Sequence, residues 1–190
     1  MRSPHILLAL ALITLSTAAS DVALAEAAPA QTAQSDAKGS FDTLKTLDGT
    51  WEGPVTTDPP VTELAPGTTA KVWLRVTSMG NALMHEMKMT GRPDDPITML
   101  YLDEGRLLLT HYCDAGNRPR MVGKAAPDRK TVEFDFLDVA GSTQYGHMHR
   151  TAFTIIDADH HTEDWTFMLP GDKHVRAHLD LRRAKPEAGK

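Results

Sequence analysis

The stretch Leu107-Leu-Leu-Thr-His-Tyr-Cys-Asp-Ala-Gly-Asn-Arg-Pro-Arg-Met121 contains the unit from which most of this chain is built. It begins as an apolar strand that ends at Cys113, turns through Asp114 to Asn117, and starts a second strand near Arg120. Gly and Asn are typical of tight turns because they tolerate the backbone angles that turns require. The stretch therefore predicts two neighbouring antiparallel strands joined by a short connection.

The same alternation of apolar and polar residues continues on both sides. We predict one short helix over 41–49, followed by about ten strands that start at residue 49 and cover 71–79, 82–90, 97–102, 106–113, 120–125, 131–139, 147–157, 161–169 and 173–183. Consecutive strands with short turns favour an antiparallel up-and-down β-barrel, since closure removes exposed strand edges. The expected fold class is all-β, and a barrel of this size leaves room for a ligand inside.

The N-terminal residues 1–25 have the pattern of a secretory signal peptide. Arg2 precedes an apolar run that is shorter than the roughly 20 residues a bilayer requires, and Ala23-Leu-Ala25 fits a cleavage site, with Ser20 as a second candidate. We therefore expect a periplasmic or secreted protein with no transmembrane segment after cleavage.

The remaining chain divides into three segments. Residues 26–40 are rich in Ala, Gln and Ser and predict a flexible linker, 41–184 form one β-barrel domain, and 185–190 form a disordered tail. A domain of this length is large enough to bury a full core.

Composition excludes some classes of partner. The chain has 20 basic and 25 acidic residues, a net charge of −5, which argues against nucleic acid as a partner. The single cysteine, Cys113, cannot form an internal disulfide. The core must therefore be held together by packing.

Short motifs carry a resemblance to known barrels. A short helix followed by Gly49-Thr-Trp-Glu-Gly53 and a run of strands resembles the calycin-like barrels, which include lipocalins, fatty-acid-binding proteins and nitrobindin-like proteins. Leu109 to Cys113, Gly116 to Met121 and Gly146 to His149 are similar to a family of exported bacterial proteins of unknown function, over most of 41–183. The resemblance implies the barrel and supplies no activity. Nitrobindin-like members bind haem through a histidine, so haem is one conjectured cofactor.

His147-Met-His149 is a candidate metal site. Residues two apart on a strand share a face at roughly 6–7 Å, so two imidazoles there could share a metal ion. A third ligand would come from His111, His85 or Glu86, and we take His147, His149 and His111 as the candidate set. The alternative is a strand-end pair that bonds carboxylates or faces solvent.

The candidate ligand-binding residues cluster near strand ends; they are His111, Cys113, Asn117, Arg120, Glu86 and Trp165. Arg120 could hold an acidic head group, or it could pair with a carboxylate such as Glu133 or Asp135. Cys113 beside His111 could be a nucleophile, or a small buried hydrophobe. We assign no catalytic residue.

Glu163 lies on the same strand face as Trp165. Burial of a carboxylate on an apolar face raises its pKa, so we expect a raised pKa at Glu163.

Three functions fit these observations. The first is an exported barrel that binds a small apolar or amphipathic molecule, with the polar end of its cavity formed by His111, Asn117, Arg120, His147 and His149. The second is a metal- or haem-binding barrel, with enzymatic activity left open. The third is a cell-envelope interaction protein without a ligand. The ligand and the oligomeric state stay open.

Overall fold

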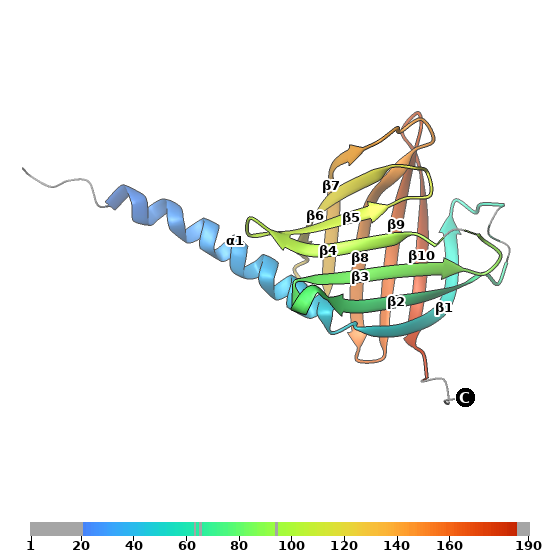
Figure 1. The fold of residues 1–190 in the computed structure, drawn as a ribbon, viewed down its shortest axis with the longest axis horizontal. Coiled ribbons are helices and arrows are strands. Elements are labelled where there is room, and N and C mark those ends of the chain that lie inside the picture. The colour runs from blue at the N-terminus through green and yellow to red at the C-terminus, as the bar shows by residue number, and fades with distance from the viewer. Residues whose placement is uncertain (1–20, 63, 65, 94, 186–190) are drawn as a thin grey trace, which may run out of the picture.

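A computed structural model describes residues 21–62, 64, 66–93 and 95–185. It consists of a helix followed by a closed antiparallel barrel of ten strands (Figure 1), as the alternation predicted. Most of the predicted signal peptide and of the C-terminal tail lies outside the described residues. The elements are α1 (Asp21–Lys45), β1 (Gly49–Asp58), β2 (Thr69–Thr77), a 3-10 turn (Ser78–Gly80), β3 (Ala82–Met89), β4 (Ile97–Asp103), β5 (Arg106–Tyr112), β6 (Arg118–Ala125), β7 (Thr131–Ala140), β8 (His147–Asp157), β9 (His160–Leu169) and β10 (Lys173–Arg183).

Each strand pairs with the next in sequence, and β1 closes the barrel by pairing with β10. The closing register places Trp51 opposite Arg183 and Val55 opposite Leu179. Inward positions on the strands are apolar for most of their length, because alternate residues of a strand point to the same side. The chain order of the strands is therefore also their order around the barrel.

The helix is longer than predicted. Residues 26–40, for which we predicted a flexible linker, lie within α1. Alanine favours the helix, and Ala37, Phe41 and Leu44 follow a helical spacing that places them on one face. All three are buried. This apolar face begins one turn before the segment that we predicted to be helical.

The C-terminal part of α1 closes one end of the barrel, which we call the helix end. Leu44 and Leu47 belong to the core, and the Trp51 indole donates a hydrogen bond to the Leu47 carbonyl at 2.7 Å. Figure 1 shows the rest of α1 extending away from the barrel. The opposite end, which we call the loop end, carries the β1–β2, β3–β4, β5–β6, β7–β8 and β9–β10 connections.

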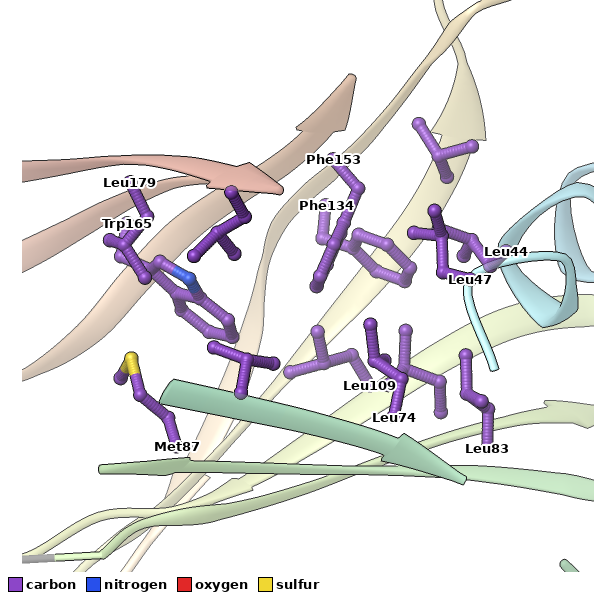
Figure 2. Close-up of a cluster of buried hydrophobic side chains, with 14 of the residues drawn as sticks. Leu44, Leu47, Leu74, Leu83, Met87, Leu109, Phe134, Phe153, Trp165 and Leu179 are labelled. Atoms are coloured by element: carbon purple, nitrogen blue, oxygen red, sulfur yellow. The ribbon is translucent and has the colours of Figure 1, made fainter. Parts of the chain in front are cut away.

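The core fills the helix end. Figure 2 shows Leu44 and Leu47 next to Phe134 and Phe153, with Trp165 on the far side of the cluster. The rings of Phe134 and Phe153 pack edge-to-face at 6.0 Å, an arrangement that aromatic pairs favour. Burial of each such side chain contributes about 1.5–3 kcal/mol, so packing alone can hold the domain together.

Among the described residues, no helix has the length and apolar character needed to cross a membrane.

Candidate ligand-binding site

On β9 and β10, inward-facing side chains become more accessible from the helix end to the loop end. On β9, Glu163 and Trp165 are buried, whereas Phe167, closer to the loop end, is half-buried. On β10, Leu179 is buried and Ala177 is half-buried. Three side chains packed against the core at or toward the loop end are likewise only partly buried: Met89, Met148 and Ala177. The barrel interior is therefore accessible at the loop end beside β9 and β10, although Val76 and Ile155, nearer the helix end, are also only partly buried.

A buried polar cluster lies beneath this accessible part. Glu163 is fully buried, and its carboxylate accepts hydrogen bonds from His85 Nε2 at 2.9 Å, His161 Nε2 at 3.1 Å and Trp165 Nε1 at 2.9 Å. A buried carboxylate is costly unless it is paired and hydrogen-bonded. Here all three donors come from side chains of the barrel wall.

These donors reverse the pKa shift that we expected for Glu163. Burial by itself raises the pKa of this carboxyl, but the charge of His85 and the hydrogen bonds from His161 and His85 together outweigh it. The pKa of Glu163 is therefore held below its ordinary value. The prediction of a raised pKa was wrong, because alternation along β9 does not reveal that β3 contributes His85.

The ionised Glu163 also fixes the histidine tautomers. A carboxylate only accepts, so Nε2 of both His85 and His161 carries a proton toward it. The Nδ1 atoms of both rings are buried without a hydrogen-bond partner, and so is Oγ1 of Thr151. Buried polar groups are usually satisfied, so these atoms are candidates for contact with a bound molecule.

His111 also packs against the Trp165 ring, with the two ring centroids 5.5 Å apart. Its Nδ1 forms a 2.8 Å hydrogen bond with Thr98 Oγ1. Burial, together with the charge of His85, lowers the pKa of His111 to about 3. His111 is therefore an uncharged imidazole near neutral pH.

Only part of the predicted ligand set meets inside the barrel. His111 and Trp165 are in contact there. Asn117 is buried, but its amide donates hydrogen bonds to the carbonyls of Ser142 and Gly146, both at 2.8 Å, and so holds the β5–β6 and β7–β8 connections together. Cys113 is half-buried at the end of β5, with Sγ 3.5 Å from an oxygen of Asp114.

Glu86 and Arg120 lie on the outer face. Glu86 neighbours the inward His85 and borders an external hollow with Trp73 and Met84. Arg120 is half-exposed and forms a two-point ion pair with Asp138, with Nε at 2.8 Å from Oδ1. Of the two interpretations of Arg120, the structure has the ion pair, with Asp138 in place of Glu133 or Asp135. A register shift at Arg120/Met121 aligns Arg120 with Asp138.

The candidate metal residues are only partly assembled. His149 Nδ1 lies 3.3 Å from His147 Nε2, and both rings pack on Phe136. Partial burial, followed by the neighbouring His149, lowers the pKa of His147. Within the described part of the chain, no three His, Cys, Asp or Glu side chains are grouped to hold a metal ion, so His111 does not join this pair.

Sequence reasoning missed the link between Glu163, His161 and His85. Alternation placed Glu163, His161 and Trp165 on one face of β9. The contact with His85, which lies 78 residues earlier on β3, depends on barrel closure. Thr98 and Thr151 were missed because nothing in their local sequence distinguishes a buried threonine from an exposed one.

Comparison with known proteins identifies the fold alone. No protein-family model and no curated protein matches the chain. The solved structure of Rv2717c from M. tuberculosis is similar with a TM-score of 0.54 and 14% identity, covering 76% of this chain and 97% of that one. A protein of unknown function of the DUF3598 family from Nostoc punctiforme is similar with a TM-score of 0.51 and 12% identity, covering 74% of this chain. This chain spans about half of the second protein, 49% of its length.

Proposed function

We propose that this protein is an exported, calycin-like β-barrel that binds a small, mostly apolar molecule through its loop end. The observation that carries the proposal is the rise in accessibility of inward side chains of two strands toward that end, from buried Trp165 to half-buried Phe167 on β9 and from buried Leu179 to half-buried Ala177 on β10. Ligand sites are mostly apolar recesses with a few polar groups that fix orientation. The half-buried Met89 and Met148 supply adaptable apolar walls.

His111 and Trp165 form the polar inner end of this site, which we call the polar floor. His111 uses Nδ1 for Thr98, which leaves Nε2 for a ligand. Because the ring is uncharged, it can take part in a neutral hydrogen bond without bringing a charge into the interior. The floor therefore suits a ligand that is apolar over most of its surface.

A first experiment is native mass spectrometry of the protein purified from the periplasm. We expect a co-purifying organic mass, and an N-terminus at Glu26 or Asp21 after removal of the signal peptide. A chain that retains Met1 in the cytoplasm would contradict export.

A pair of variants tests the location. Ala177→Phe adds bulk at a half-buried inward position, and Arg176→Phe places the same aromatic side chain at its exposed neighbour. We expect Ala177→Phe to lose the co-purifying molecule and Arg176→Phe to keep it. Equal retention by both folded variants would contradict binding at the loop end.

A metal site is the second candidate function, and the 3.3 Å approach of His147 and His149 favours it. Metal analysis of the same sample tests it. A stoichiometric transition metal that is lost in His149→Gln would support this function, and a metal-free protein that is not stabilised by added zinc or iron would contradict it.

A further inference from the structure

Two unpartnered polar atoms lie in the wall around the Trp165 ring. His85 Nδ1 and Thr151 Oγ1 have no hydrogen-bond partner, and each residue is 1% exposed. The His85 ring centroid is 5.4 Å from that of Trp165, and Thr151 pairs with Trp165 in the β8–β9 register. Two buried polar atoms that lack a hydrogen-bond partner and lie beside one aromatic ring indicate a binding site for a polar group of a ligand.

The hydrogen-bonding capacity of His85 restricts what that group can be. Glu163 holds the Nε2 proton of His85, so Nδ1 accepts a hydrogen bond when the ring is neutral and donates one when the ring is charged. A hydroxyl group both donates and accepts, and it is therefore complementary to either state. Thr151 Oγ1 has the same dual capacity.

Charge excludes an acid as the best occupant. Among the described residues, the buried polar and charged side chains include Glu163 and three histidines of the interior but no Lys or Arg. A ligand carboxylate would lie near the Glu163 carboxylate, with no arginine or lysine to offset it and with the charge of His85 already paired with Glu163. Arg120, which could have held an acidic head group, is on the outer face and paired with Asp138.

We propose that His85 and Thr151 form a polar subsite that receives the hydroxyl group of an uncharged, otherwise apolar ligand, with Glu163 as the residue that positions His85. The subsite rests on the proposed function, because the ligand reaches it from the loop end. Phe153 and Trp165 both pack against the His85 ring, with centroid distances of 6.0 and 5.4 Å, and these rings favour an aromatic ligand.

Three probes that share one ring system test the subsite: 1-naphthylmethanol, 1-methylnaphthalene and 1-naphthoate. Binding to the whole protein is followed by energy transfer from tryptophan. We expect the alcohol to bind about tenfold more tightly than the methyl compound, because it adds one buried hydrogen bond. The naphthoate should bind more weakly than the alcohol by at least about the same factor. The ¹⁵N resonance of His85 Nδ1 should shift with the alcohol and stay unchanged with the methyl compound.

Two variants separate recognition from positioning. Thr151→Val preserves shape, and should reduce the advantage of the alcohol while leaving the affinity for 1-methylnaphthalene unchanged. In Glu163→Gln the side-chain amide has one oxygen that accepts and one NH₂ group that donates, so it cannot accept a hydrogen bond from both histidines in the way that the carboxylate does. The ¹⁵N chemical shifts that report the tautomer of His85 or His161 should therefore change. Asp164→Asn is the matched control, because Asp164 pairs with His178 on the outer face.

The outcomes distinguish the two proposals. Equal affinity for the alcohol and the methyl compound, or tighter binding of the naphthoate, overturns the subsite and leaves the proposed function standing. Failure of all three probes to bind also overturns the subsite, whereas the proposed function is decided separately by native mass spectrometry and the Ala177→Phe comparison. The probe series and the ¹⁵N measurement on the unmodified protein decide the question even where a variant fails to fold.

Discussion

At the scale of single residues, the interior histidines are distinguished by what surrounds them. His85 and His161 bond the Glu163 carboxylate, whereas His111 has only the Thr98 hydroxyl and the nearby charge of His85. A histidine without an acidic partner in an apolar interior avoids the charged form. His111 therefore couples folding to pH.

The first residue-scale prediction concerns that coupling. The pKa of His111 falls from 6.5 to about 3 on folding, so the unfolded chain binds the extra proton between these values. Its contribution to stability is fully present above pH 6.5 and is lost as pH falls, by about 1.4 kcal/mol per unit. Urea unfolding at pH 7.5 and 5.0 should show a loss of about 2 kcal/mol due to His111.

His111→Gln removes the titration and retains a hydrogen-bonding side chain for Thr98. We expect a smaller loss between pH 7.5 and 5.0 in this variant, and an unchanged loss in His174→Gln, which alters an exposed histidine. The pKa of Glu163 is below its ordinary value, so its contribution is lost only below about pH 4.5, outside this window. Parallel pH profiles for the wild type and His111→Gln would refute the coupling.

At the scale of elements, two glycines show how α1 and β1 differ in their surroundings. A Cβ at Gly39 of α1 would meet no atom within 4 Å, whereas a Cβ at Gly53 of β1 would lie 1.7 Å from the Asp180 carbonyl oxygen of β10. Gly39 is therefore a weak point of the helix, and Gly53 is required for the close approach of the two strands that close the barrel.

Alanine substitutions at these two positions should have opposite effects. Gly39→Ala should raise the free energy of unfolding by about 0.5–1 kcal/mol, because alanine favours the helix. Gly53→Ala should lower it by about 3 kcal/mol or more, because the strands must separate to admit the methyl group. Thermal unfolding followed by circular dichroism measures both, and a neutral Gly53→Ala would contradict the tight β1–β10 pairing.

At the scale of the whole molecule, the barrel is held closed where its first and last strands meet. Arg183 at the end of β10 stacks over Trp51 with Cζ 4.2 Å from the ring and donates to the Asp48 carbonyl at 2.9 Å. It also bonds the β8–β9 turn, at Ala158 and Asp159. One side chain therefore links the α1–β1 junction, β10 and the β8–β9 turn at the helix end.

Loss of this link should weaken the whole domain. We expect Arg183→Met to lower the free energy of unfolding by about 1–3 kcal/mol, because methionine retains the stem and loses the hydrogen bonds. The adjacent Arg182→Met, at an exposed position, should change it by less than about 0.5 kcal/mol. Urea unfolding monitored by circular dichroism compares them, and equal effects would argue against a closing role for Arg183.

The sequence by itself determined the barrel. The alternation of apolar and polar residues and the turns between strands are local properties of the sequence. If a strand slipped by one residue against its neighbour, its whole apolar face would be exposed. The alternation and the turns therefore specify the strands, their order and their neighbours. The inward placement of His111 and Trp165 followed from the same rule. The helical pattern was detected only from Phe41, although Ala37 continues it.

Tertiary structure alone decided which polar groups meet. Barrel closure brings His85 of β3 to Glu163 of β9, and a register shift in β6–β7 places Arg120 beside Asp138. Neither contact is local, and the pKa of a buried group depends on charges that approach it from other strands. The sequence therefore supplied the candidate side chains, and only the closed barrel set their partners and charge states.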